Sequence, residues 1–330
     1  MKTYNSIRLD FSSRIFFSGR FTLLYIIKTA LELGLLYAPV PLALFLSFRI
    51  LNIADLTTDG CFVLGAAVSV TWAAALHPIL GIPVAMAAGV CAGFVTAFLQ
   101  TRLGVPAILA GIITNFGLYT VNLMVMGWSS SVNLLKTATI FTMFRSLNIF
   151  GGFSDIVLVA IITFIAAALL LWFLSTRLGL SIRATGDNAD MVRASSVNPR
   201  FTTTVALCVA NSLTALSGAM VGQYQNTVDI NSGTGIVVIA LACLIIGETL
   251  LGKKTMVKGV IAAFVGSIVY RIIYAIVLFT GIVPIQGLKL ITALVVAFAI
   301  AYPTIKERVV FLRKKRLASK GFEGEGKENA

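Results

Sequence analysis

The chain repeats one pattern, in which long apolar stretches are separated by short polar connections. About 20 apolar residues suffice for a helix to cross a hydrocarbon core about 30 Å thick. Backbone groups in a bilayer must bond to one another, and the chain lacks the alternation typical of membrane strands, so the stretches are predicted as helices. The pattern predicts an all-α polytopic membrane protein with about nine transmembrane helices, between eight and ten. The predicted spans are residues 21–48, 60–76, 82–101, 105–127, 155–175, 201–222, 234–250, 257–279 and 288–304.

Two of these spans leave alternatives open. Residues 21–48 form an overlong stretch that contains Pro39 and Pro41. Residues 60–76 form a short stretch that contains glycine. Because proline interrupts helical hydrogen bonding and a short helix does not cross the full core, either span is continuous, broken or re-entrant.

Composition supports the membrane class and removes several kinds of site. The chain is 58% hydrophobic and 12% charged, with a mean hydropathy of +0.95, against about 25% charged residues in soluble domains. The four cysteines lie in apolar runs without a C-x-x-C pair, so neither a disulfide framework nor a zinc site is predicted. His77 is the one histidine, which excludes a histidine-based metal cluster. No metal or cofactor is therefore predicted in this chain.

Lysine and arginine are concentrated in every second connection between the predicted spans. Residues 49–59, 102–105, 176–200, 251–258 and 306–320 together carry 16 Lys and Arg, whereas the alternate connections carry only Lys136 and Arg145. The positive-inside rule places the first set, and the C-terminus, in the cytoplasm. Nine spans would put the N-terminus outside although residues 1–20 hold four basic residues, so that segment is an interfacial helix or the count is wrong by one.

The charge pattern also suggests the domain organisation. We expect an N-terminal extension at 1–20, a transmembrane domain at 21–305 with a cytoplasmic loop at 176–200, and a basic cytoplasmic tail at 306–330. The formal charge of +13 does not indicate nucleic acid, because the basic residues lie where topology requires them. The tail is expected to contact anionic membrane lipid, at about 1 kcal/mol per basic residue.

Residues 178–201, LGLSIRATGDNADMVRASSVNPRF, form the longest charged interruption. The interruption has a modest apolar stripe and charges of both signs. Asn188 is expected to cap a short helix and Pro199 to end it. Such a helix parallel to the membrane would be a docking surface. The alternative is a solvated loop whose arginines only set topology.

Several segments carry a resemblance to a known family. They are Ser181 to Asn188 (SIRATGDN), Ala194 to Asn198 (ASSVN), Leu213 to Gly222 (LTALSGAMVG), Phe48 to Ala67 (FRILNIADLTTDGCFVLGAA) and the stretch from Gly222 to Glu248. In order and spacing they resemble permeases of bacterial ABC importers of the branched-chain amino acid and ribose type. The family motif would include Asn52, Asp55, Asp59 and Gly60. Its form DLTTDG is similar to a subfamily associated with aromatic amino acid uptake.

The resemblance implies a type II ABC importer-like bundle in the bacterial inner membrane, with several partners. These would be a second permease copy in a homodimer, cytoplasmic ABC ATPase subunits that bind ATP and Mg²⁺, and an extracytoplasmic substrate-binding protein. The cargo would be a small solute, with an aromatic amino acid favoured. Polar contacts to the ATPase would come from Arg183 and Asp187 and an apolar anchor from Met191 and Val192. The full set of expected coupling residues is Arg183, Gly186, Asp187, Asn188, Met191 and Val192.

Polar residues inside the spans are candidates for a substrate path, because they tend to face a cavity or the bundle interior. Asn115 and Asn122 are seven residues apart and share a helix face, while Asn211 and Thr214 form a second polar face. Arg271 lies well inside its span and could recognise a carboxylate. The alternative for the amides and hydroxyls is helix–helix hydrogen bonding, and for Arg271 a buried ion pair or carbonyl clamp.

Other chemistry is weakly represented. Gly247 to Lys254 approaches the phosphate-binding pattern G-x-x-x-x-G-K-[ST], but Lys254 replaces the hydroxyl residue and an apolar helix precedes it. Without a paired-carboxylate, Ser/His or metal constellation the chain is predicted not to be an enzyme. The alternative function is an ion-coupled secondary transporter, which requires intramembrane carboxylates that the predicted spans nearly lack.

Overall fold

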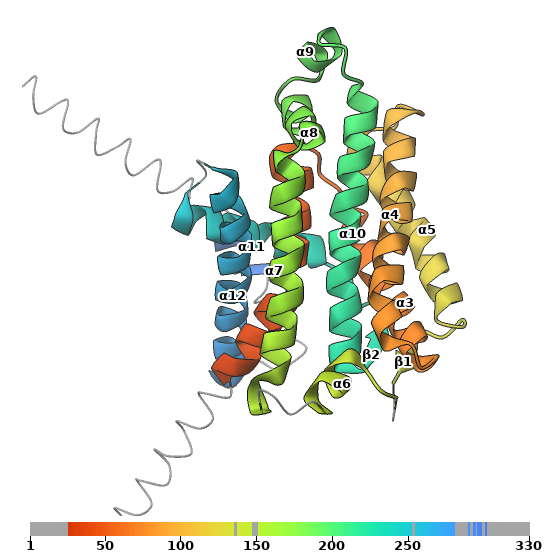
Figure 1. Ribbon diagram of the computed structural model, residues 1–330, viewed down its shortest axis with the longest axis vertical. Helices are drawn as coiled ribbons and strands as arrows, with labels where there is room; N and C mark the ends of the chain where they lie inside the picture. Colours follow the sequence, from red (N-terminus) through yellow and green to blue (C-terminus); the bar gives the residue numbers. More distant parts are fainter. Residues whose placement is uncertain are drawn as a thin grey trace, which may run out of the picture. The chain divides into compact units, whose positions relative to one another are not determined.

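The computed structural model describes residues 26–134, 137–146, 151–252 and 255–280, and a few further residues between 290 and 301. The described chain is helical apart from its connections and one short pair of strands (Figure 1). The first span is Ile26–Ile50, which includes α2 (Pro39–Leu44) and a π-helical turn, η1 (Phe45–Ile50). The elements that follow are α3 (Thr58–Ala74), α4 (Pro78–Thr101), α5 (Ala107–Val125), β1 (Ser131–Asn133), α6 (Ile140–Ser146), η2 (Gly151–Phe153), α7 (Ser154–Ser175), α8 (Arg177–Asp187), α9 (Ala189–Ala194), α10 (Pro199–Gln225), β2 (Thr227–Asp229), α11 (Ile236–Leu251) and α12 (Met256–Thr280).

The all-α polytopic class is confirmed. Six described helices are long and apolar enough to cross a membrane, and α3 and α11 are shorter apolar helices. Each of the first eight predicted spans coincides with one of these eight helices. The ninth predicted span, 288–304, the extension 1–20 and the tail 306–330 lie largely or wholly outside the described residues. The count of about nine therefore stays a prediction.

The chain divides into two units, Met1–Ile282 and Val283–Ala330. The first unit holds all the elements named above. In the second unit the described residues, which begin at Leu290, are helical. The fold and sites described below belong to the first unit.

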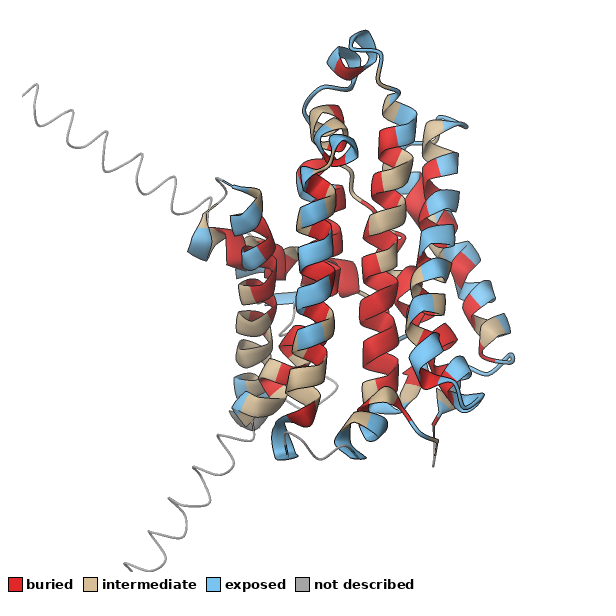
Figure 2. Cartoon of the chain, viewed as in Figure 1, coloured by how far each residue is buried: buried red, intermediate tan, exposed pale blue. Residues whose placement is uncertain are grey.

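Helix α10 is the central element of the first unit. It is 27 residues long, and 83% of its most apolar 18-residue stretch is buried. In α4, α5 and α7 the corresponding stretch is buried over a third of its residues or fewer. Figure 2 shows this contrast as a nearly continuous buried surface along α10 beside outer helices with exposed faces. The exposed faces are apolar, as expected of helices that contact lipid.

Small residues allow α3 to approach α10 closely. A Cβ on Gly218 would lie 2.0 Å from the carbonyl oxygen of Phe62, and a Cβ on Gly65 would lie 2.1 Å from that of Ala215. Gly222 lies beside Ala66 one turn further along the same contact. Gly218 and Gly222 therefore form a close helix contact, in which the two backbones approach each other directly.

The two ends of the unit differ in character. At one end β1 and β2 pair antiparallel, with Ser131 opposite Asp229 and Asn133 opposite Thr227. At the other end α8 lies beside the first turns of α10, α9 projects beyond the bundle, and Pro199 then begins α10 (Figure 1). The role expected for Pro199 is wrong: it starts the following helix instead of ending the loop helix, because its fixed φ and missing N–H suit a first helical position.

The connection 49–59 is not the solvated cytoplasmic loop that the charge count implied. Residues 51–57 lack helical structure, yet Leu51, Asp55 and Thr57 are buried, as is Thr58 at the start of α3. Asp55 bonds to Asn211, which lies near the middle of α10, so α3 begins deep inside the bundle. Its 17-residue length follows from that internal start.

Gly218→Ala should destabilise the protein, because the added methyl group meets a backbone oxygen that cannot move alone. Overpacking of this kind costs at least about 1–3 kcal/mol. The measurement is the thermal midpoint of the purified protein in detergent. Gly117→Ala is the matched control, since a Cβ at Gly117 in α5 meets nothing within 4 Å. Equal midpoints for the two variants would contradict the close contact.

Candidate functional site

The polar segment 49–60 connects the first span to α3 and contains all four motif residues predicted from sequence. Asn52 has a φ of 55°, in the left-handed region that asparagine tolerates better than most residues. The backbone N–H of Ile53 donates to the carbonyl of Ser47 at 2.9 Å, which closes the turn. The segment therefore reverses direction at Asn52 and re-enters the bundle.

Asn52 joins this segment to the charged loop. Its side-chain Nδ2 donates to the carbonyl oxygen of Gly186 at 3.0 Å, across 134 residues of sequence. A Cβ on Gly186 would lie 1.8 Å from the carbonyl oxygen of Ile50, so only glycine permits this approach. The end of α8 is thus held directly against the end of the first span.

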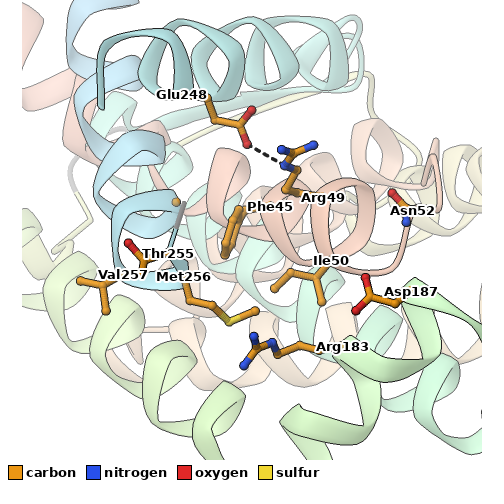
Figure 3. A pocket seen from close by; sticks show the side chains of 11 residues that line it. Phe45, Arg49, Ile50, Asn52, Arg183, Asp187, Glu248, Thr255, Met256 and Val257 are labelled. Atoms are coloured by element: carbon orange, nitrogen blue, oxygen red, sulfur yellow. Dashed lines mark ion pairs between the residues drawn. The ribbon is translucent and has the colours of Figure 1, made fainter. Parts of the chain in front are cut away.

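A cavity of about 690 Å³, here called the α8 cavity, lies beside this junction (Figure 3). Arg49 donates to the carboxylate of Glu248 at 3.1 Å across it. The Glu248 side chain is 6% exposed and that of Arg49 is 41% exposed. Arg183 and Asp187 of α8 line the same cavity, so the two charged residues expected to contact a partner lie together. The residues that line it are Phe45, Arg49, Ile50, Asn52, Arg183, Asp187, Glu248, Thr255, Met256, Val257 and Gly259.

The charged loop contains two short helices, where the sequence predicted one. Thr176 caps α8 by accepting from the N–H of Gly179. The side chain of Asn188 accepts from the N–H groups of Asp190 and Met191, so its predicted capping role is confirmed for α9. Asn198 caps α10 in the same way, through the N–H of Arg200. Each helix of the loop therefore has a defined start.

The loop exposes three large apolar side chains, those of Leu178, Leu180 and Met191. Met191 is 63% exposed, whereas Val192 is 3% exposed and packs inside the loop. Of the two residues expected to anchor an ATPase, only Met191 offers surface in this conformation. Beside it, Arg193 pairs with Asp190 at 3.0 Å, with both side chains exposed.

A buried polar cluster lies deeper in the bundle. Asp55 accepts from Asn211 Nδ2 at 2.7 Å with one oxygen and from the N–H of Thr57 at 2.9 Å with the other. Thr57 and Thr96 share a hydroxyl hydrogen bond at 2.8 Å. The hydroxyl of Thr214 donates to the carbonyl of Ala210 in its own helix at 3.2 Å. Asn211 and Thr214 are both buried, and their bonds favour the packing alternative over a substrate path.

A second cavity, the α5 cavity, has a volume of about 390 Å³ and lies between α3, α5 and residues 230–234. Asn115 and Asn122 both line it, so the shared helix face predicted from their spacing is confirmed. Asn122 Nδ2 donates to the carbonyl of Gly60 at 3.1 Å, and a Cβ on Gly60 would lie 2.4 Å from Asn115 Oδ1. The structure thus brings the motif residues Asp59 and Gly60 together with two predicted path residues.

Asp59 also fixes the start of α11. Its two carboxylate oxygens accept from the N–H groups of Gly235 and Val237 at 3.0 and 2.9 Å. A carboxylate at a helix N-terminus is favoured by the helix dipole and satisfies N–H groups that lack intrahelical partners. Because Arg49 pairs with Glu248 near the other end of α11, the segment 49–60 contacts this helix at both ends.

Arg271 packs against aromatic rings, and its role in recognising a carboxylate stays a prediction. Its guanidinium lies 3.7 Å from the ring centroid of Tyr37 and 6.0 Å from that of Tyr274, which is cation–π packing. Tyr270 and Tyr274 stack on each other with centroids 6.5 Å apart. By contrast, Lys28 forms an ion pair with Glu32, with Nζ 3.7 Å from Oε1.

Four carboxylates are buried or partly buried in the described bundle, two from predicted spans and two from the connection 49–59. Glu32, Asp55 and Glu248 are buried, and Asp59 is partly buried. Asp55 and Asp59 had been counted with a polar connection, and the inward path of 51–57 carries them into the bundle. Sequence reasoning also passed over Arg49 as a partner of Glu248. The available signal was a cation just after the first apolar span, next to the polar motif.

Comparisons with known proteins agree with the resemblance. Residues 26–304 match the family described as "Branched-chain amino acid transport system / permease component". The tyrosine transport system permease protein of Clostridioides difficile is 32% identical over 264 residues, which cover 80% of this chain and 86% of that protein. An uncharacterized protein of Rickettsia prowazekii is 32% identical over 282 residues, covering 84% and 97%. The autoinducer 2 import system permease protein of Salmonella paratyphi B is 29% identical over about half of each chain. No solved structure matches the chain.

A double-mutant cycle on Arg49→Gln and Glu248→Gln should give a coupling free energy of about 1–3 kcal/mol, between the values for exposed and buried pairs. The cycle separates this pair from other contacts of Glu248. The measurement is resistance of the detergent-solubilised protein to denaturation. The same cycle on Arg193 and Asp190, exposed by 69% and 89%, should give less than about 1 kcal/mol. A coupling no larger than this control would contradict a structural role for the pair.

Proposed function

This chain belongs to the family of permease components of branched-chain amino acid transport systems, and we propose that it forms the membrane pathway of a binding-protein-dependent ABC importer. ATP and Mg²⁺ are bound by separate cytoplasmic ATPase subunits that dock on the loop at 176–200. A second copy of the chain completes the pathway in a homodimer. An extracytoplasmic binding protein delivers the cargo. The chain lies in a bacterial inner membrane with its C-terminus in the cytoplasm.

The observation that carries this proposal is the contact between Asn52 and Gly186. It connects the one long charged loop of the described chain to the segment that reaches the α5 cavity. Coupling between distant sites requires packed elements with discrete arrangements. A loop with capped helices, held to the bundle by a close glycine contact, meets that requirement. Displacement of α8 would move Asn52 and, through the segment 49–60, would also move Asp59 and Gly60.

The proposed cargo is an amino acid, with an aromatic one favoured. The similar protein from Clostridioides difficile is described as a tyrosine transport system permease protein, which supports this choice. Phe116 and Tyr119 line the α5 cavity and supply aromatic surface there. Asn115 and Asn122 lie on the proposed path, whereas Asn211, Thr214 and Arg271 serve packing.

Met191→Glu should abolish co-purification of the ATPase, because it places a charge on the most exposed of the loop's large apolar side chains. The measurement is a pull-down of the solubilised permease from its native host, with bound subunits identified by mass spectrometry. Met143→Glu is the matched control, since Met143 is also exposed but lies in α6, at the end opposite α9 (Figure 1). Retention of the ATPase by Met191→Glu, or its loss in both variants, would contradict docking on the loop.

Asn52→Gly should lower the amount of substrate transported per ATP roughly two- to tenfold, the effect of one lost hydrogen bond of about 0.5–1.5 kcal/mol. Glycine keeps the left-handed backbone and removes only the side chain that holds Gly186. The measurement is uptake and ATP hydrolysis in the same proteoliposomes. Asn226→Gly is the control, because Asn226 has the same φ of 55° at the other end of α10. An unchanged ratio for Asn52→Gly would remove Asn52 from the coupling route.

A further inference from the structure

The α5 cavity has an uneven distribution of charge. The described residues that line it include one carboxylate, from Asp59, and three carboxamides, from Asn115, Asn122 and Asn231. They include no lysine or arginine. A group that enters this cavity therefore meets oxygen acceptors and one negative charge without a competing cation of the protein.

Asn122 supplies an acceptor that is left open. The residue is 1% exposed, and its Nδ2 is used by the carbonyl of Gly60. Its Oδ1 is buried and has no hydrogen-bond partner among the described residues. A buried acceptor without a donor costs about 1–3 kcal/mol. A ligand that brings an N–H or O–H donor to this oxygen recovers that free energy.

Asp59 directly precedes Gly60, whose carbonyl holds the Asn122 side chain, and it lines the same cavity. Each of its carboxylate oxygens accepts one backbone N–H from the start of α11. An ionised carboxylate has about four lone-pair sites, so two backbone donors leave capacity for a further donor. The carboxylate is also held in place, which lowers the entropic cost of binding.

Another part of the α5 cavity wall is aromatic. Phe116 and Tyr119 are three residues apart on α5, and they are 74% and 49% exposed. Residues three apart on a helix are neighbours on its surface. The cavity therefore combines a small polar pole with an aromatic pole, within the size range of small-molecule sites.

We propose that the α5 cavity binds the primary ammonium group of an aromatic amino acid during its passage through the permease. The ammonium group donates to Asn122 Oδ1 and to the Asp59 carboxylate. The ring lies against Phe116 and Tyr119, and the carboxamide N–H groups of Asn115 and Asn231 receive the substrate carboxylate. This assignment rests on the proposed transport function and adds to it the group by which the pathway recognises its cargo.

The test uses p-azido-L-phenylalanine as a photoprobe on the permease purified with its ATPase subunits and reconstituted in nanodiscs. Labelled peptides should map to α5 or to residues 230–235. L-Phenylalanine and phenethylamine, which carry the ammonium group, should protect against labelling, whereas 3-phenylpropionate should not. Labelling elsewhere, no specific labelling, or equal protection by 3-phenylpropionate would overturn the assignment. Protection by sodium or potassium ions alone would also overturn it, because the site would then be a simple cation site.

Two variants separate recognition from folding. Asn122→Leu should weaken protection by both amines about ten- to hundredfold, the range for a hydrogen bond to a charged group of about 1.5–3 kcal/mol. Phe116→Ala, at an exposed position that does not threaten folding, should reduce the preference for L-phenylalanine over L-alanine. Ile113→Ala is the control, since Ile113 is 52% exposed on α5 but does not line the cavity.

ATPase association and ATP hydrolysis are measured in the same preparations. If both persist while the amines fail to protect, the ammonium site is wrong and the importer function stands. If the wild-type permease retains no ATPase, the proposed function itself fails.

Discussion

The structure depends on a constraint that lipid imposes on polar backbone and side chains: each must find a partner inside the protein. The segment 49–60 is the place where this constraint is hardest to meet, because it leaves helical structure and turns into the bundle. Its polar side chains meet the constraint by bonding to different elements. Arg49 reaches α11, Asn52 reaches α8, Asp55 reaches α10 and Asp59 reaches the start of α11. One short segment thereby contacts most of the elements that a transport cycle would have to move.

The short helix α11 illustrates the consequence. Its N-terminal N–H groups are satisfied by Asp59, and Glu248 near its C-terminus pairs with Arg49. Both partners come from the same ten or so residues, so that segment helps to position α11, together with close backbone packing of α11 against α12. Asn52 ties the segment in turn to the charged loop. Hydrogen bonds therefore connect the charged loop to the segment 49–60, and that segment to the α5 cavity.

Close packing makes these bonds possible. The contacts of Gly65 and Gly218 bring α3 against α10 with no side chain between the backbones. That approach places the buried start of α3 beside Asn211 and leaves Asp59 within reach of α11. A close glycine contact also holds the charged loop against the bundle, because Gly186 contacts the carbonyl of Ile50. Glycine at these positions allows the backbones to approach closely, and the polar side chains then fix the relative positions of the helices.

The sequence by itself determined the helical membrane class, the positions of eight helices, the charged loop and the family, because apolar length, charge alternation and ordered motifs are local properties. It also identified the Asn188 cap and the shared face of Asn115 and Asn122, which depend only on spacing. Only the tertiary structure decided that 51–57 turns into the bundle, that Val192 is buried and that Asn211 bonds to Asp55. It alone decided the partners of Arg49 and Asn52, which lie 199 and 134 residues away along the chain. The physical reason is that such partners are chosen by helix packing in three dimensions, and a local pattern of hydrophobic and polar residues does not record which helices become neighbours.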